Sequence, residues 1–222
     1  MKHKVTIVDD HPIVRQGLAQ LINQDNELGV CGEASDIPSA LQSVKECLPD
    51  IAVVDISLGQ SSGLSLIEEL SRQYPDLTIL ALSMHDEALY AERCLRAGAK
   101  GYIMKKEPPE EVIKAIKDVL NGEIYVSDNL GSRLLHKLVA NKSGALSSDL
   151  DVLSNRELEV FRLIGQGVKT GKIAEQLNLS IKTIETYIDH IKKKMHFKDS
   201  RDLFLHAVQW RINESDPAGP LK

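Results

Sequence analysis

Short apolar runs alternate with longer amphipathic segments through the first half of the chain. Val5–Val8, Ile51–Val54 and Leu77–Leu82 are runs of apolar or β-branched residues, and weaker runs lie near Leu28–Cys31 and Gly101–Met104. Runs of this length without strict alternation are typical of strands that are buried on both faces. Because helix-length segments separate them, the pattern predicts an α/β domain with a doubly wound, parallel, five-stranded sheet.

The segments between these runs carry helix-start signals. Pro12 stands where the first turn of a helix accepts proline, and Pro108 and Pro109 precede two acids that suit a helix N-terminus. The later segment continues as an amphipathic stripe and ends near Asn121 and Gly122. We therefore expect the α/β domain to occupy residues 1–122.

The pattern changes after this domain. Residues 123–152 form a polar connector in which we expect a helix at about residues 129–140. Residues 153–212 are entirely helical in pattern and predict a second, all-α domain. The end of the chain, residues 213–222, contains two prolines and a glycine and is expected to be disordered.

Capping residues divide the second domain into helices. Ser154 and Glu157 form a capping-box pattern ahead of an apolar stripe. Thr170 and Ser180 are candidate caps of two further helices, and the helix after Ser180 should run to about Met195. A last helix is expected at about residues 200–211.

Composition and charge narrow the class of protein. With 42% hydrophobic and 27% charged residues the chain suits ordered domains, and it has no apolar run that could span a bilayer. Acids follow the first apolar run too soon for a signal peptide, so we expect a cytoplasmic protein without a membrane partner. Residues 1–125 carry 12 Lys and Arg against 20 Asp and Glu, whereas the remainder has a basic excess that suits nucleic acid.

The three cysteines, Cys31, Cys47 and Cys94, are odd in number, widely spaced and surrounded by apolar residues in the sequence. We interpret them as reduced core thiols rather than as disulfide, metal or catalytic cysteines. The histidines show no spacing typical of metal ligands either. We therefore assign no metal site to cysteine or histidine.

Polar residues follow the ends of four predicted strands. Asp9 and Asp10 follow the first strand, and Asp55, Ser83 and Lys105 stand at the ends of the third, fourth and fifth strands. Ligands of open α/β sheets bind at this edge. Three neighbouring carboxylates repel one another unless a proton or a cation joins them, and hard oxygen ligands suit Mg²⁺. The sequence thus predicts a Mg²⁺ site where a carboxylate attacks phosphorus.

The motifs around these residues resemble the receiver domain of NarL/FixJ-type response regulators. The similarity covers about residues 3–122 and lies in Ile7–Pro12, Val54–Leu64, Leu82–Asp86 and Ala97–Lys105. It implies that Asp55 accepts a phosphoryl group, that Asp9, Asp10, Asp55 and the backbone carbonyl of Ser57 bind Mg²⁺, and that Ser83 and Lys105 hold the phosphoryl group. It also implies that Tyr102 is a switch residue that turns inward on phosphorylation.

The receiver motif also has departures. Leu58 and Gly59 replace the common Met-Pro, and Lys106 replaces a proline or an acidic residue. We expect Gly59 to loosen the loop after the phosphorylation site.

A second constellation lies in the helix after Ser180. Its apolar residues repeat at spacings of three and four and predict one buried face: Ile181, Ile184, Ile188, Ile191 and Met195. Its other face carries residues that suit DNA, with short polar groups first and lysines last: Lys182, Thr183, Glu185, Thr186, Asp189, His190, Lys192 and Lys193. A solvated amphipathic helix would show much the same pattern.

The wider sequence resembles a LuxR-type helix-turn-helix. Leu153–Val160, Gly165–Gly167, Lys172–Ala174 and Leu179–Thr186 carry this similarity. It implies a four-helix domain in which the helix after Ser180 reads DNA and the last helix pairs two subunits. Glu185 could accept a hydrogen bond from cytosine N4, whereas Asp189 departs from a position that is often cationic.

Together these features predict a two-component response regulator that regulates transcription. Its expected partners are a sensor histidine kinase, promoter DNA and a second copy of the phosphorylated chain, with RNA polymerase as a further candidate. Its only expected catalysis is its own phosphoryl transfer and dephosphorylation. The alternative is a receiver with a protein-binding or phosphate-independent output. A phosphatase or nucleotide-binding enzyme is disfavoured because no second acid follows Asp55 by two residues and the turn after Val8 lacks glycine-rich spacing.

Overall fold

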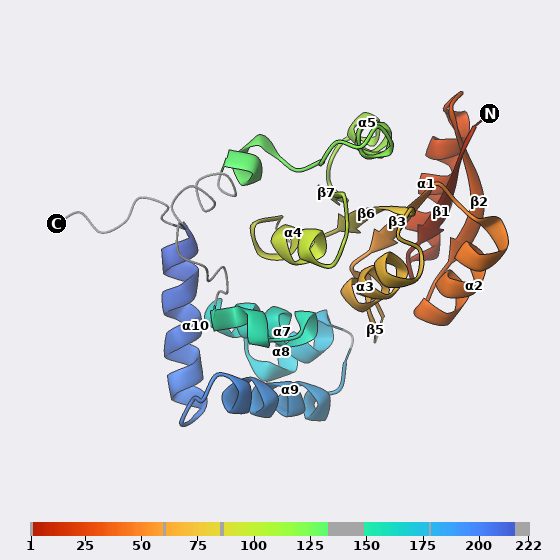
Figure 1. The fold of residues 1–222 in the computed structure, drawn as a ribbon. Helices are drawn as coiled ribbons and strands as arrows, with labels where there is room; N and C mark the ends of the chain where they lie inside the picture. Colours follow the sequence, from red (N-terminus) through yellow and green to blue (C-terminus); the bar gives the residue numbers. More distant parts are fainter. Residues whose placement is uncertain (1, 60, 85–86, 133–148, 178, 216–222) are drawn as a thin grey trace. The chain divides into compact units, whose positions relative to one another are not determined.

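The chain forms two compact units, Met1–Lys142 and Ser143–Lys222. The computed structural model describes residues 2–59, 61–84, 87–132, 149–177 and 179–215, drawn as a ribbon in Figure 1. Within these residues no helix is both long and apolar enough to cross a membrane.

A five-stranded parallel sheet organises the first unit. Its strands are β1 (His3–Val8), β2 (Leu28–Ala34), β3 (Ile51–Asp55), β6 (Thr78–Ser83) and β7 (Gly101–Met104), in the order β2-β1-β3-β6-β7. Strand order reverses between β1 and β3, and this places the carboxyl ends of both strands at the switch point. The predicted doubly wound sheet is confirmed.

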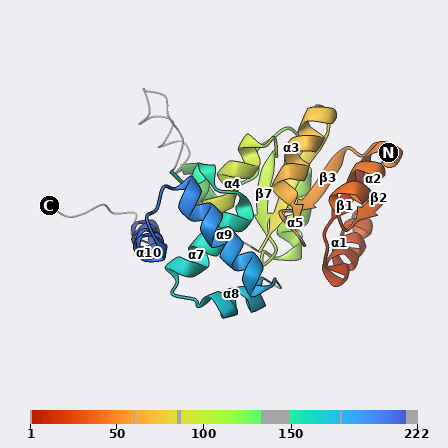
Figure 2. The same cartoon turned by 90° about the horizontal axis from the view of Figure 1, so that it is seen from below.

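Helices cover both faces of the sheet, as Figures 1 and 2 show. Helices α1 (Pro12–Gln24) and α5 (Pro109–Leu120) pack on one face, and α2 (Ile37–Cys47), α3 (Gly63–Gln73) and α4 (Glu87–Arg96) pack on the other. The prolines at the start of α1 and α5 occupy first-turn positions, as predicted. The sheet is therefore buried on both sides, which explains its continuous apolar runs.

The core under α1 and α5 holds the central strands in place. Val5, Ile7, Ile51 and Val53 are buried to 1% exposure or less and pack with residues of α1 and α5, such as Ile116. Burial of this kind is worth about 1.5–3 kcal/mol per large side chain. The strand ends that carry the acids are thus held by a rigid framework.

Of the cysteines, Cys94 is buried, as expected of a core thiol. Cys31 and Cys47 are partly exposed, so the expectation of a core position is wrong for these two. The reason is their place at the margin of the sheet, in edge strand β2 and at the last residue of α2.

A small hairpin follows β3 at the position of Gly59. Strands β4 (Ser57–Leu58) and β5 (Ser61–Ser62) pair antiparallel, and Gly59 has φ +51 in the turn between them. That left-handed conformation favours glycine. At the start of α3, a Cβ on Gly63 would collide with the backbone oxygen of Asp55. The departure at Gly59 therefore suits a turn that needs a left-handed residue, and the expected loosening of this loop stays a prediction.

The connector begins alongside the edge of the sheet. Tyr125 forms a parallel bridge with Gly101, and the backbone N–H of Tyr102 donates to its carbonyl oxygen at 2.8 Å. The Tyr125 hydroxyl donates to Glu111 of α5 at 2.8 Å. Residues 128–132 are helical, as expected for the start of the connector helix. The remainder of that predicted helix lies outside the described residues.

The second unit is helical throughout its described residues. A short 3-10 helix, η1 (Asp149–Val152), precedes α7 (Asn155–Gly165), α8 (Thr170–Gln176), α9 (Ile181–Lys194) and α10 (Ser200–Ser215). All four predicted helices are therefore present.

The capping predictions for these helices were correct in two cases of three. The capping box of Ser154 and Glu157 and the Ser180 cap are confirmed. The prediction for Thr170 was off by one position, since Lys169 is the N-cap of α8 and makes no side-chain cap hydrogen bond. Helix α10 also continues through Ser215, so the expected tail from residue 213 begins too early.

Helix α9 packs through fewer isoleucines than its spacing predicted. Ile184 and Ile191 are fully buried, whereas Ile188 and Met195 are half-buried. Ile181 is 54% exposed, so its prediction as a buried residue is wrong. It occupies the first helical position, where the chain has only just entered the helix.

Candidate metal-binding site and nucleic-acid interface

The acidic residues of two neighbouring strands meet at the switch point of the sheet. Asp9 follows β1 and Asp55 ends β3, and both are at most 1% exposed. Lys105 follows β7, and its Nζ lies 2.7 Å from Asp9 Oδ2 and 2.7 Å from Asp55 Oδ2. One ammonium thus joins two buried carboxylates that would otherwise repel each other.

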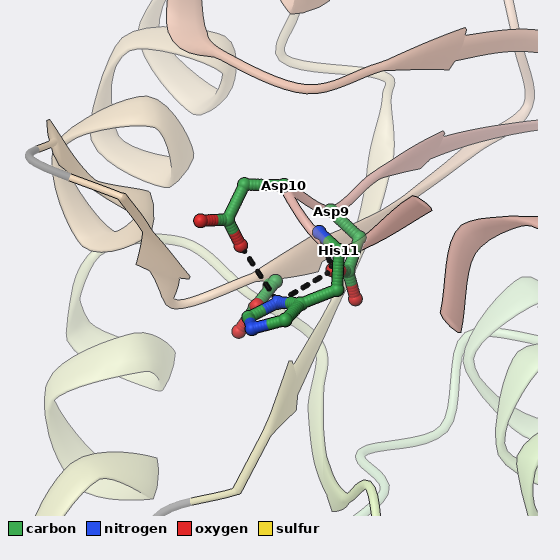
Figure 3. A group of neighbouring side chains, drawn as sticks. Asp9, Asp10 and His11 are labelled. Carbon is green, nitrogen blue, oxygen red and sulfur yellow. Dashed lines mark hydrogen bonds and ion pairs between the residues drawn. The ribbon is translucent and has the colours of Figure 1, made fainter. Parts of the chain in front are cut away.

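His11 also faces this cluster, as Figure 3 shows. Its backbone N–H donates to Asp9 Oδ1 at 2.8 Å, and its Nδ1 lies 3.3 Å from the same oxygen and 2.8 Å from Asp10 Oδ1. Sequence reasoning assigned no histidine to this site. The available signal was its position directly after the two acids, which a search for ligand spacing does not detect.

These side chains could hold a metal ion. Asp9, Asp10, His11 and Asp55 each offer one ligand atom, and these atoms lie within 4.8 Å of one another. Asp10 Oδ1 is buried, and its close polar neighbour among the described residues is His11 Nδ1 at 2.8 Å. A buried carboxylate oxygen in that situation gains from a cation, and three carboxylates form the hard oxygen set that divalent cations bind.

Burial sets the protonation equilibria at this site. It raises the pKa of Asp55 to about 6, although Lys105 opposes this change, and the charge of Asp9 adds to it. Burial alone would lower the pKa of Lys105, but the two carboxylates outweigh it and the pKa is raised. Lys105 therefore stays protonated at neutral pH, while Asp55 ionises against a desolvation cost.

The other expected residues of this site lie at the same edge. The backbone N–H of Ser57 donates to Asp55 Oδ1 at 2.9 Å. Ser83 is buried at the end of β6, and its carbonyl oxygen accepts from the Lys105 N–H at 2.7 Å. Tyr102 is only 1% exposed, so this structure already holds the expected switch residue inside.

The raised pKa of Asp55 predicts how metal-free stability changes with pH. An acid whose pKa is raised by folding stabilises the folded state below its unfolded pKa, and this contribution disappears as pH rises toward the folded pKa. For Asp55 the window lies between 3.8 and about 6. Asp55→Asn should therefore gain stability relative to wild type across this window, by up to about 3 kcal/mol.

Urea unfolding of both proteins in EDTA, from pH 4 to pH 7.5, measures this difference. Added Mg²⁺ should reverse the sign at pH 7.5, because only the wild type retains the Asp55 carboxylate. A pH-independent difference between the two proteins in EDTA would contradict the assignment.

The expected DNA-facing residues of α9 fall into two groups. Six of them are exposed and form the outer surface of the helix: Lys182, Glu185, Thr186, Asp189, His190 and Lys193. Thr183 and Lys192 are half-buried. The Thr183 N–H donates to Ser180 Oγ at 3.0 Å, so this threonine belongs partly to the helix cap.

Several charged side chains of α9 form ion pairs with other residues of the same unit. Lys192 Nζ lies 2.8 Å from Asp189 Oδ1, and this contact lowers the pKa of Asp189. Lys194 Nζ lies 2.7 Å from Glu157 Oε2, and His190 Nδ1 lies 3.6 Å from Glu157 Oε1. Lys182 and Lys193 have no such described ion pair and leave their charge on the exposed surface.

An acidic site at the switch point of a doubly wound sheet, followed by a helical unit with a helix-turn-helix order, is the arrangement of a regulator with a receiver and a DNA-binding domain. The response regulator receiver domain family matches residues 5–117, and the luxR family of bacterial regulatory proteins matches residues 151–207. The chain belongs to the two-component response regulators with a LuxR-type DNA-binding domain, which regulate transcription.

Two of three similar proteins match nearly the whole length of the chain, and the third matches about two thirds of it. The oxygen regulatory protein NreC of Staphylococcus aureus is 36% identical over 215 residues, which are 95% of this chain and 99% of NreC. RcsB of Salmonella enterica serovar Typhimurium, bound to promoter rprA with the phosphomimetic BeF3-, has a TM-score of 0.58 at 28% identity and covers 94% of this chain and 99% of its own. A LuxR-family regulator from Aurantimonas sp. has a TM-score of 0.58 at 31% identity and covers 63% of this chain and 99% of its own.

Proposed function

We propose that Asp55 accepts a phosphoryl group from a sensor histidine kinase and that this phosphorylation controls dimerisation and DNA binding. The observation that carries the proposal is the convergence of Asp9, Asp10, Asp55 and Lys105 at one edge of the sheet. The receiver would comprise residues 1–122, the connector residues 123–152 and the DNA-binding domain residues 153–212. The site would act on its own Asp55 alone.

The acidic residues fit Mg²⁺. Asp10, Asp9 and Asp55, together with the backbone carbonyl of Ser57, would hold it, and when bound it neutralises charge on the transferring phosphoryl group. The buried carboxylate of Asp55 is poised as the nucleophile, since the hydrogen bond from the Ser57 N–H orients its Oδ1. Asp9 and Asp10 are positioned by the end of the same strand, β1.

Lys105 contacts both the acidic residues of the site and the end of β6. It bridges Asp9 and Asp55 in this structure, and a phosphoryl group on Asp55 would offer it a stronger anionic partner. Ser83 would hydrogen-bond that group from the end of β6. Because the N–H of Lys105 bonds to the Ser83 carbonyl, both residues would shift together. This displacement would change the packing between α4 and β7, the strand that contains Tyr102.

Dimerisation of the DNA-binding unit is supported by α10. Phe204, Leu205 and Ile212 are 42%, 55% and 52% exposed there, so this helix offers three large apolar side chains that a second copy could cover. RcsB, a similar protein, has been described as two dimers bound to two parallel DNAs. Two copies of this chain would place two α9 helices in successive half-sites, about one or more helical turns apart.

The test compares the full chain with and without acetyl phosphate and Mg²⁺. We expect phosphorylation to raise the dimer fraction in analytical ultracentrifugation and to raise the affinity for DNA from its own promoter. Asp55→Asn should show neither change. If phosphorylation alters neither quantity in the wild type, the output is phosphate-independent and the proposal is wrong.

The exposed charge of Lys193 predicts a specific effect on DNA affinity. Lys193→Ala should weaken binding to every DNA sequence and reduce the salt dependence, log K against log [salt], by about one unit. Lys100→Ala is a matched control, because Lys100 is an exposed lysine of the receiver and its removal should leave the salt slope unchanged. Fluorescence anisotropy at several salt concentrations measures both. Equal slopes for Lys193→Ala and wild type would contradict this orientation of α9.

Base preference should depend on a different part of the same helix. Glu185 is exposed one turn from the N-terminus of α9 and could accept from cytosine N4. Thr186 lies beside it, with its hydroxyl donating to the Lys182 carbonyl at 3.0 Å. These residues are proposed to affect sequence preference, whereas Lys193 affects overall affinity.

A further inference from the structure

The receiver holds a pair of thiols that phosphorylation chemistry does not use. Cys31 lies in β2 and Cys47 ends α2, two elements that pack against each other, and both cysteines are partly exposed. The Cys47 thiol donates a hydrogen bond to the backbone oxygen of Cys31 at 2.8 Å. The two residues are therefore in direct contact although 16 positions separate them.

An irregularity in β2 turns the Cys31 side chain toward α2. The register shifts after Val5, so that Val5 pairs with Val30 and Thr6 pairs with Gly32. Cys31 is thus the extra residue of a bulge. In a regular strand, Cys31 and its neighbour Gly32 would face opposite sides. Here both face Thr6, since Cys31 Sγ lies 3.7 Å from Thr6 Oγ1 and a Cβ on Gly32 would lie 3.1 Å from the same oxygen.

Gly32 leaves the space that Cys47 occupies. A Cβ at Gly32 would lie 3.0 Å from Cys47 Sγ and would collide with Ser43 Oγ. The missing side chain therefore lets α2 approach the bulge closely. The Cys47 thiol lies against the Cys31 backbone, 2.8 Å from its oxygen, and the Cys31 sulfur lies 3.7 Å from Thr6 Oγ1. Bulge, glycine and helix end together bring the Cys47 thiol into contact with Cys31.

We propose that Cys31 and Cys47 are a redox-modification site that forms an intramolecular disulfide when the chain meets a peroxide. Both thiols are partly exposed, so a small oxidant can reach them. The third cysteine, Cys94, provides a contrast, since it is fully buried and burial raises its pKa to about 12. It is therefore expected to stay reduced.

The chemistry balances with hydrogen peroxide as the oxidant. The Cys47 sulfur attacks one peroxide oxygen, an S–O bond forms, the O–O bond breaks and the other oxygen leaves as water with the thiol proton. The Cys31 sulfur then attacks the sulfenic acid of Cys47, an S–S bond forms, the S–O bond breaks and a second water leaves with the Cys31 proton. Two thiols lose two electrons in total, and one peroxide becomes two waters. The same disulfide and the same two waters result if Cys31 is oxidised first and Cys47 then attacks it.

The disulfide would tie edge strand β2 to the end of α2. It closes a loop of 16 positions, and a cross-link over such a loop constrains the unfolded chain. The unfolding temperature of the receiver is expected to rise by roughly 10 °C in the oxidised protein. Reduction by dithiothreitol should return it to the original value.

The experiment treats the full chain with hydrogen peroxide, alkylates the remaining thiols and maps peptides by mass spectrometry. The expected result is a Cys31–Cys47 cross-linked peptide in the monomer that dithiothreitol releases, with Cys94 alkylated. Cys31→Ala and Cys47→Ala should each lose the cross-link and the rise in unfolding temperature, whereas Cys94→Ala should retain both.

Peptide mapping of the wild-type protein tests for the cross-link without any substitution. The test therefore stands even if one of the variants folds poorly. Sulfinic or sulfonic acid at single cysteines without the cross-linked peptide would overturn the proposal. Disulfides that join only different chains, or a cross-link that survives in Cys31→Ala, would also overturn it.

Discussion

Asp55→Asn is expected to abolish labelling of the chain by acetyl phosphate and Mg²⁺, whereas the wild type should take up one phosphoryl group that is stable in acid and labile in alkali. The amide cannot act as the nucleophile that the carboxylate provides. Intact mass spectrometry and a phosphate-retarding gel both measure the label.

Two further variants separate the roles at this site. Asp10→Ala should lose Mg²⁺ binding, which isothermal titration of the unphosphorylated chain detects independently of labelling. Asp50→Asn, which changes a half-exposed aspartate just before β3, should be labelled like the wild type. Undiminished labelling of Asp55→Asn would remove Asp55 as the phosphoacceptor and with it the proposed control of the output.

Glu157→Ala is expected to destabilise the DNA-binding unit by roughly 2–3 kcal/mol. Glu157 is only 3% exposed, and its Oε2 accepts hydrogen bonds from the Ser154 N–H and from Lys194 Nζ, each at 2.7 Å. Alanine would leave the Ser154 N–H without its capping partner. It would also remove the ion pair with Lys194 that joins α7 to α9. The partly exposed Lys194 can return to water, which keeps the loss below that of a fully buried ion pair.

The effect of removing this charge should depend on pH. Burial alone would raise the pKa of Glu157, but Lys194 and Ser154 outweigh it and the pKa is lowered. A carboxyl with a lowered pKa contributes stability above its unfolded pKa and loses it as pH falls through the folded pKa. Glu157→Gln should therefore be less stable than wild type at pH 7 and approach it below about pH 4.

Chemical unfolding followed by Trp210 fluorescence reports on this unit, because Trp210 packs against Phe161 of α7. Glu185→Ala, an exposed acid on α9, serves as the control and should leave the unfolding midpoint unchanged. The DNA affinity of Glu157→Ala should fall only under conditions in which the DNA-binding unit is partly unfolded. A midpoint equal to that of wild type at pH 7 would mean that α9 does not depend on this contact.

Patterns that depend on local sequence predicted the fold closely. The five strands follow from continuous apolar runs, because a parallel sheet covered on both faces cannot tolerate alternating polar residues. The capping box at Ser154 and the Ser180 cap follow from hydrogen bonds that span three residues. The order of acids at strand ends also predicted which side chains meet, since parallel strands bring their carboxyl ends to one edge.

Relations between distant residues required the tertiary structure. The sequence alone did not reveal that Lys105 bridges Asp9 and Asp55, that His11 turns toward Asp10, or that Glu157 holds Lys194. Each of these depends on where a side chain ends in space rather than on periodicity.

The structure differs most clearly from the sequence-based predictions where the regular spacing of apolar residues in a helix or strand is interrupted. Ile181 matches the apolar spacing of α9 but lies at its first residue, so it is exposed rather than buried. Cys31 lies in an apolar run of β2, yet it is the extra residue of a bulge, and its backbone oxygen accepts from the Cys47 thiol. The sequence by itself determined the fold class, the family and the acids at the strand ends, because these follow from local periodicity and motif spacing. The bulge and the helix end were decided by packing between elements, which periodicity does not encode.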